Sequence, residues 1–223
     1  MRTIIVPTAP IAALCLILSA APARAESNRH ELWIGGSARA LRSPSANALT
    51  DANLSGSSLG YAHDLGISLV PGSAIWLEAG VTTGAADGTM FKTMTTELTT
   101  LDLTGGLRAR YALHRLIVAS ARLDLGAQRV RVNISDPSTS GSDHSWGPIA
   151  SVGTALDVFA KASAPFGIGM RVELGYVVAP GLSLTPHRPV ADDDVIMLPR
   201  TDFALGKLDL GGPSFTVSLL GQF

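Results

Sequence analysis

The sequence predicts an all-β chain that closes into an eight-stranded antiparallel up-and-down transmembrane β-barrel. Three observations support this fold class. Eight segments alternate apolar with polar residues, so each places its apolar side chains on one face. The connections between them alternate between long polar segments and short turns. The last segment keeps its alternation up to Phe223, which indicates a paired strand because unpaired chain ends fray.

The N-terminus has the pattern of an export signal. Arg2 provides a positive charge, residues 4–20 form an apolar run, and Ala23-Arg24-Ala25 matches a small-x-small cleavage pattern. Two prolines inside the apolar run disfavour an uncleaved anchor helix. We therefore expect cleavage near Ala25, with residues 26–223 forming a single barrel domain. The only cysteine, Cys15, lies in the expected leader, so the mature chain is expected to contain no disulfide.

The composition narrows the possible classes of protein. Hydrophobic residues make up 46% of the chain. No segment after the leader approaches the roughly 20 uninterrupted apolar residues of a membrane helix. The formal net charge is −1 and the sequence contains no basic run, which argues against nucleic acid as a partner. Two options remain, a transmembrane barrel and a soluble β-protein.

The expected strands are separated by connections of two kinds. The strands are expected at 30–42, 54–69, 73–84, 98–111, 116–132, 146–160, 166–178 and 208–223. The long polar connections are 43–53, 85–97, 133–145 and 179–207, and the short ones are 70–72, 112–115 and 161–165. This sorting by length is typical of an up-and-down barrel whose ends face different compartments. The short turns and both chain ends are expected on the periplasmic side, and the four long loops on the outer surface.

The alternation is clearest in four of the segments. Apolar residues or Gly occupy the odd positions of 75–81, 101–111 and 117–125, and apolar residues occupy the even positions of 170–176. The intervening positions are mostly charged or polar, which gives each strand one apolar and one polar face. Periodicity alone does not say which of the two faces meets water.

Charged residues in the middle of the strands fall on the polar face, five of each sign. Eight strands close a barrel just wide enough for side chains to fill it. We therefore expect these charges to pair inside a plugged polar lumen. The expected lumenal charge network is Arg39, Glu78, Asp102, Arg108, Arg110, Arg122, Asp124, Asp157, Arg171 and Glu173.

The last strand adds a resemblance to a known group. Its apolar face consists of Phe215, Val217, Leu219 and the terminal Phe223, which resembles the C-terminal membrane-insertion signal of bacterial outer-membrane barrels. With the export signal, the strand number and the loop alternation, the chain resembles the small eight-stranded outer-membrane proteins of Gram-negative bacteria. This group includes the transmembrane domain of OmpA and OmpX. The resemblance implies assembly by the barrel assembly machinery and contact with outer-membrane lipid and lipopolysaccharide.

The sequence offers no convincing catalytic set. Asp143-His144-Ser145 has suitable residue types, but consecutive residues of an extended chain point to opposite sides. We therefore predict no catalytic residue and no cofactor. The acidic run Asp192, Asp193 and Asp194 could contact a cation or lipopolysaccharide, although it lacks the spacing of a dedicated calcium loop. A solvated acidic loop tip is the favoured interpretation, so no metal site is predicted.

Two other groups of residues have more than one interpretation. Arg129 and Arg131 could contact lipopolysaccharide phosphates or extend to the membrane surface. His30 and His63 have no second ligand at a useful spacing and are interpreted as surface residues.

The resulting functional hypothesis is a non-catalytic outer-membrane barrel with a plugged lumen and four surface loops, in a structural or surface-binding role. A narrow small-solute pore is the first alternative, and it requires the lumenal charges to line a path instead of pairing across it. A soluble periplasmic β-sandwich or lipocalin-like binding protein is the second. Fold alone does not choose among them.

Overall fold

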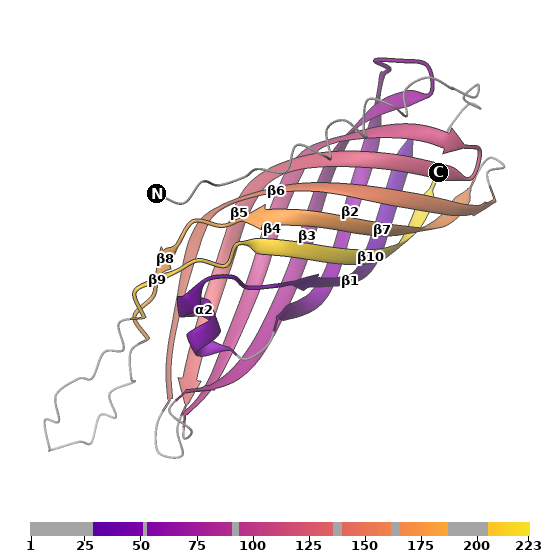
Figure 1. Ribbon diagram of the computed structural model, residues 1–223. Helices are drawn as coiled ribbons and strands as arrows, with labels where there is room; N and C mark the ends of the chain where they lie inside the picture. Colours follow the sequence, from indigo (N-terminus) through magenta and orange to yellow (C-terminus); the bar gives the residue numbers. More distant parts are fainter. Residues whose placement is uncertain (1–28, 51–52, 91–93, 136–139, 162–165, 187–204) are drawn as a thin grey trace, which may run out of the picture.

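A computed structural model describes residues 29–50, 53–90, 94–135, 140–161, 166–186 and 205–223. The expected export signal and the acidic run at Asp192–Asp194 lie outside these ranges. Eight long strands form one closed antiparallel barrel in the order β1-β10-β7-β6-β5-β4-β3-β2 (Figure 1). Their bounds are β1 His30–Arg39, β2 Leu54–Ile67, β3 Ser73–Met90, β4 Met94–His114, β5 Ile117–Ser135, β6 Ser140–Lys161, β7 Gly167–Val178 and β10 Gly212–Gln222.

The barrel closes between its first and last strands. β1 pairs with β10 on one side and with β2 on the other, and Trp33 lies opposite both Leu220 and Gly60. The remaining pairs join strands that follow one another along the chain. The exception is β7 with β10, which are separated in the sequence by a small two-stranded sheet. The predicted eight-stranded up-and-down barrel is therefore confirmed. Closure pairs the backbone of every strand on both sides, which a bilayer requires because it supplies no water to an open edge.

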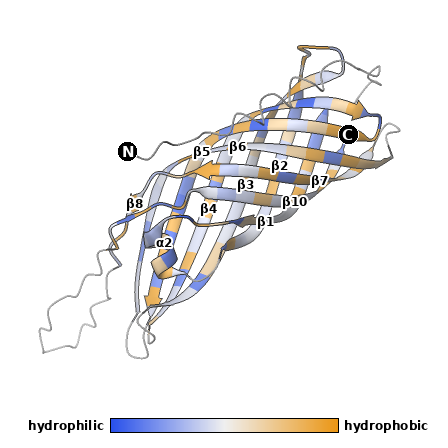
Figure 2. Ribbon diagram, viewed as in Figure 1, coloured by the Kyte–Doolittle hydropathy of each residue, from blue (hydrophilic) through white to orange (hydrophobic). Residues whose placement is uncertain are grey.

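The outer surface of the barrel is apolar over the length needed to cross a bilayer. On β5 the outward positions from Ile117 to Ala127 are all apolar, which matches the roughly 9–11 residues of a spanning strand. Leu123 is 60% exposed and Leu125 is 65% exposed. Figure 2 shows the resulting alternation of hydrophobic and hydrophilic residues along the strands. Such a continuous apolar belt is stable against hydrocarbon and unfavourable in water.

The direction of the apolar face reverses at the outer end of the barrel. Past Ala127, the outward side chains of β5 are Arg129 and Arg131, which are exposed. Val130 and Val132 alternate with these two arginines, point inward and are fully buried. A strand surrounded by water needs its apolar side chains inside, so this reversal marks the outer boundary of the membrane.

Two of the predicted loops are wrong. Most of 85–97 belongs to β3 and β4, and most of 133–145 belongs to β5 and β6. These segments look polar because their outward residues stand above the membrane and meet water. The four strands β3–β6 therefore rise beyond the other four as an extended wall.

A cap covers the inner face of this wall. It consists of helix α2 (Pro44–Leu49) and a hairpin of β8 (Leu182–Ser183) and β9 (Lys207–Leu208), which lie at the end of the barrel away from the C-terminus (Figure 1). Ser45 Oγ donates a hydrogen bond to the carbonyl oxygen of Lys207 at 3.0 Å and joins the two parts. No helix within the described ranges is long and apolar enough to span a membrane.

The cap and the wall enclose an apolar core. It is the larger of the two buried apolar clusters and lies above the membrane, so its stability comes from excluding water. Its buried members are Leu41, Ala46, Leu49, Leu54, Ala86, Leu98, Val130, Val132, Ile134, Ile149, Val177, Ala179, Leu184, Leu208 and Leu210.

Candidate functional site

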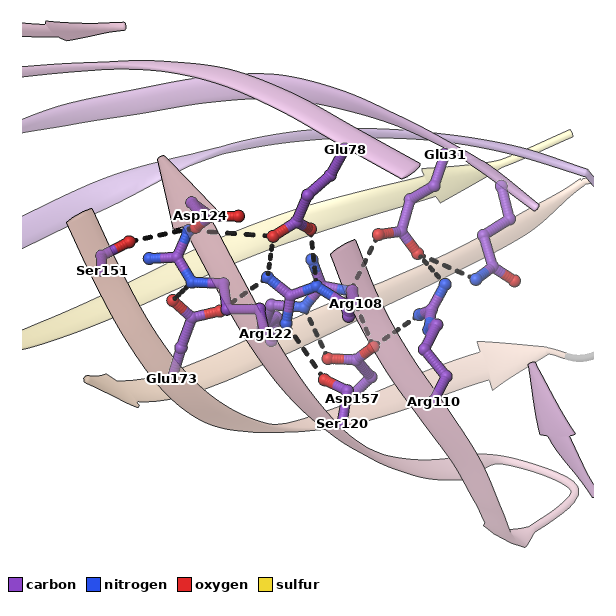
Figure 3. A network of polar contacts seen from close by, with 12 residues as sticks. Glu31, Glu78, Arg108, Arg110, Ser120, Arg122, Asp124, Ser151, Asp157 and Glu173 are labelled. Atoms are coloured by element: carbon purple, nitrogen blue, oxygen red, sulfur yellow. Dashed lines mark hydrogen bonds and ion pairs between the residues drawn. The ribbon is translucent and has the colours of Figure 1, made fainter. Parts of the chain in front are cut away.

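The middle of the lumen is filled by ion pairs that cross between strands. Arg108 on β4 is 2% exposed, and its Nε donates to Glu78 Oε2 on β3 at 2.7 Å. Its Nη2 donates to Glu173 Oε2 on β7 at 2.8 Å, and its Nη1 to Ser120 Oγ on β5 at 3.0 Å. One guanidinium thus links four strands across the inside of the barrel (Figure 3).

Arg122 extends this group toward the outer end. Its Nη1 lies 2.6 Å from Asp124 Oδ2, and its Nε lies 2.6 Å from Glu173 Oε1. Asp124 also accepts a hydrogen bond from Ser151 Oγ at 3.1 Å. Because Glu173 is shared by Arg108 and Arg122, the two guanidinium groups belong to one network (Figure 3).

A second group lies toward the opposite end of the barrel, near the C-terminus. Arg171 Nε is 2.7 Å from Asp157 Oδ1, and its Nη2 is 2.8 Å from Glu31 Oε1. Arg110 joins the same two carboxylates, at 2.5 Å from Asp157 Oδ2 and 2.8 Å from Glu31 Oε2. Gln222 on the last strand donates to Glu31 Oε2 at 2.9 Å. Strands β1 and β10, where the barrel closes, are thereby tied to β4, β6 and β7.

All ten residues of the expected lumenal network face the barrel interior. The remaining pair, Arg39 with Asp102, lies nearest the cap, and Gln128 Nε2 donates to Asp102 Oδ1 at 2.8 Å. Sequence reasoning missed Glu31, which is fully buried. Glu31 lies an even number of positions from Trp33 and Arg39, so the three side chains share one face of β1. This spacing is the signal that could have identified it as lumenal. Within the described part of the chain, the buried ion pairs join five arginines to six carboxylates.

An aromatic layer closes the lumen below the charges. The guanidinium of Arg110 lies 4.6 Å from the centre of the Trp76 ring, and that of Arg171 lies 6.0 Å from Trp33. Gly60 leaves the space that Trp33 fills, since a Cβ there would lie 2.1 Å from the indole ring. Phe159 and Leu220 pack in the same buried cluster as the two tryptophans. The polar lumen predicted from the sequence is therefore bounded by apolar layers at both ends.

Two small cavities lie inside the described part of the barrel. One cavity of about 50 Å³ lies beside Arg39, whose Nε and Nη1 have no hydrogen-bond partner there. A second of about 30 Å³ lies between Arg108 and Arg171. Each has room for a few water molecules at roughly 10–15 Å³ apiece, and hydroxyl groups line both.

The outer rim of the membrane belt carries a basic and aromatic surface. Arg131 on β5 lies opposite His144 on β6, and Arg129 lies opposite Trp146. All four side chains are exposed, and no ion pair involves either arginine within the described ranges. We refer to these four residues as the rim cluster. Asp143 points the other way and accepts a hydrogen bond from the backbone N–H of Thr185 at 2.7 Å, so it secures the cap.

The other predicted residues divide into two sets. Phe215, Val217, Leu219 and Phe223 all occupy outward positions of the last strand, and three of the four are exposed. His30 and His63 are direct cross-strand partners with their Nδ1 atoms 3.3 Å apart, so the interpretation that each lacks a neighbouring ligand is wrong. That pairing depends on the register of β1 and β2, which the spacing in the sequence does not reveal.

Comparison with known proteins supports the fold. Neither a scan of protein-family models nor a search of curated proteins gives a match. Among solved structures, Ail, the attachment invasion locus protein of Yersinia pestis, matches with a TM-score of 0.50 and 10% sequence identity. That match covers 88% of this chain and 99% of Ail. The chain shares the fold of Ail.

A second Ail structure, in complex with the heparin analogue sucrose octasulfate, has a TM-score of 0.49 at 10% identity, with the same coverage of 88% and 99%. At this identity the likeness to Ail concerns the fold. The apolar belt of this chain indicates a membrane location without any reference to Ail. A closed barrel that is apolar outside and polar inside is the transmembrane architecture of the bacterial outer membrane.

Proposed function

We propose that the chain is a non-catalytic outer-membrane barrel that keeps its lumen closed and acts through its outer surface, as a structural or surface-binding protein. The observation that carries this proposal is the filling of the lumen at three successive levels. These are the aromatic layer around Trp33 and Trp76, the ion-pair network, and the apolar core under the cap. A solute pore would need a continuous path through all three.

The closed lumen predicts the electrical behaviour of the protein. In planar bilayers, the purified barrel is expected to give no steady single-channel steps. An open outer-membrane porin in the same bilayers is the positive control, because Arg108→Ala/Arg122→Ala would leave the aromatic layer and the apolar core in place. Steady steps from the unmodified protein would support the small-solute pore instead.

The non-catalytic role is supported by the separation of the residue types that hydrolysis requires. Asp143 faces the cap, whereas its neighbour His144 faces outward at the rim. An acid and a base on opposite sides of one strand cannot act on the same substrate atom.

The rim cluster supports lipopolysaccharide as the lipid partner. Two unpaired arginines stand directly above the apolar belt on one strand, next to His144 and Trp146. The phosphates of the outer leaflet lie at this height, and guanidinium groups bind phosphate with paired hydrogen bonds. Trp146 fits the same position, since indole rings favour the boundary between hydrocarbon and water. The acidic run Asp192–Asp194 stays a candidate for cation-mediated contact with the same lipid.

Removing both arginines is expected to weaken lipopolysaccharide binding. Arg129→Ala/Arg131→Ala should lower the affinity about 10- to 30-fold at low salt, given roughly 1 kcal/mol for each basic residue at an anionic membrane surface. The measurement is binding of purified lipopolysaccharide to the barrel in phosphatidylcholine nanodiscs. Arg115→Ala is the matched control, since Arg115 is exposed at a short turn on the opposite side. Equal losses in the two variants would refute a site at the rim.

A further inference from the structure

Three side chains with metal-binding atoms meet on the outside of the barrel at its periplasmic end. His63 Nδ1 lies 3.3 Å from His30 Nδ1, and the hydroxyl oxygen of Tyr61 lies 2.5 Å from the same His30 nitrogen. His30 belongs to β1, whereas Tyr61 and His63 belong to β2. The ring of Phe223 stacks on His30 with the centroids 5.6 Å apart and covers its other side.

The strand pairing explains why the two imidazoles are so close. The backbone N–H and C=O of His30 both bond to Phe223, the residue after β10. His30 therefore makes no backbone hydrogen bond with its partner His63 on β2. Such non-hydrogen-bonded pairs of an antiparallel ladder bring their side chains closest, with Cα atoms about 4.5 Å apart. The backbone of β1, β2 and β10 thus fixes both rings in place.

The separation of the two nitrogens fits ligands of one metal ion. Zinc binds histidine nitrogen at about 2.0–2.1 Å, and two ligands at a tetrahedral angle are then about 3.3–3.4 Å apart. The ring centroids lie 4.9 Å apart at an interplanar angle of 29°, whereas the Nδ1 atoms are 3.3 Å apart. The rings therefore converge at their Nδ1 edges, as two ligands of a shared ion do.

We propose that His30 and His63 form a binding site for a divalent transition-metal ion, with water completing the coordination. The ion would replace the hydrogen bond between Tyr61 and His30 Nδ1, because at 2.5 Å these two atoms are too close to be ligands at a tetrahedral angle. Imidazole nitrogen favours Cu²⁺ and Zn²⁺ over Mg²⁺ and Ca²⁺, and the affinity of such sites is highest for Cu²⁺. No group of three or more His, Cys, Asp or Glu in the described ranges could hold a metal, so this site rests on two imidazoles and water. A site with so few protein ligands exchanges its metal readily.

The position of the site is independent of the proposed function at the outer surface. Phe223 follows directly on β10 and pairs with His30, and His30 pairs with His63, at the end of the barrel that holds the turns after β2 and β4. Both histidines are partly exposed there, so an ion on the periplasmic side can reach them. Failure of the lumen or rim predictions would leave this site unaffected.

The test is a titration of the purified, untagged barrel in detergent with Cu²⁺, followed by electron paramagnetic resonance. We expect one Cu²⁺ per chain with hyperfine splitting from two imidazole nitrogens. His30→Gln and His63→Gln should each lower the affinity about tenfold or more and remove one nitrogen from the spectrum. Tyr61→Phe removes a hydroxyl that competes for His30 Nδ1, so it should not weaken binding and should keep both nitrogens.

His144→Gln is the matched control, because His144 is an exposed histidine at the other end of the barrel. Its affinity and spectrum should equal those of the unmodified protein. The mobility of unboiled samples on a gel verifies that each variant is folded. Unchanged Cu²⁺ binding in folded His30→Gln and His63→Gln would overturn the proposal, and so would a spectrum with no pair of imidazole nitrogens. Either result would leave the contact between the histidines as a hydrogen bond only.

Discussion

Replacing Arg108 with methionine is expected to lower the free energy of unfolding by about 3–5 kcal/mol, the usual cost of breaking a buried ion pair by removing one partner. The substitution leaves Glu78 and Glu173 inside the lumen without the guanidinium that both contact. Methionine fills much of the space but supplies no hydrogen-bond donor. The measurement is unfolding in urea or guanidinium chloride after refolding into phospholipid vesicles.

Two further variants separate the loss of charge pairing from other effects. Arg131→Met removes an exposed arginine above the membrane and should change the stability by no more than about 0.5 kcal/mol. Glu173 keeps its ion pair with Arg122, so Glu78 is the carboxylate that loses its close partner. Arg108→Met/Glu78→Gln removes that carboxylate, so it should recover part of the loss. Equal stabilities of Arg108→Met and the unmodified protein would mean that the network contributes nothing to keeping the barrel folded.

Introducing a charge on the membrane belt is expected to have the second-largest effect. Leu123 is 60% exposed on β5, near the middle of its outward apolar positions. Leu123→Arg should destabilise the folded barrel by about 2–4 kcal/mol, the cost of arginine on the lipid face near the bilayer midplane. The same vesicle-based unfolding titration measures it.

This substitution distinguishes lipid from water as the medium around the barrel. In a soluble protein, an exposed leucine can be replaced by arginine at a cost within about 0.5 kcal/mol. Thr95→Arg is the control, since Thr95 is an exposed residue on the part of β4 above the belt. It should be nearly neutral. Similar stabilities for Leu123→Arg and Thr95→Arg would contradict a lipid-facing belt.

The sequence predicted the strands because their signal is local. A period of two is visible within each segment, as in Leu123 and Leu125 against Arg122 and Asp124, and it holds without knowledge of the partner strand. The lumenal charges follow from the same period, since opposite charges on the polar faces of a narrow barrel have few places other than the lumen. Glu31 was missed because it stands at the start of β1, where the alternation had only begun.

The outer half of the molecule was less predictable for a physical reason. Beyond Gln128 the medium around β5 changes from lipid to water, so the apolar residues shift from the outward to the inward positions of the strand. Val130, Val132 and Ile134 then belong to a water-excluding core. From Asn133 onward the polar residues favour a loop in the sequence, whereas the strand continues to Ser135. A change of phase in the alternation along a strand is the signal that locates such a boundary.

The cap and the histidine pair depend on contacts between distant segments. Helix α2 has six residues, too few to show a helical period, and it is held through Ser45 to Lys207. His30 and His63 come together through the register of two strands, and register is not encoded in either strand alone. Both features needed the three-dimensional structure.

The central claim is that hydrocarbon surrounds the apolar face of the closed barrel, and spin-label accessibility tests it most directly. The only cysteine of the chain is Cys15, within the expected leader, so single labels can be placed at Leu123→Cys on the belt and Arg115→Cys at a short turn. In vesicles, the label at 123 should collide readily with oxygen and hardly at all with a water-soluble nickel complex, and the label at 115 should show the opposite. High accessibility of position 123 to the nickel complex would contradict a membrane-spanning barrel.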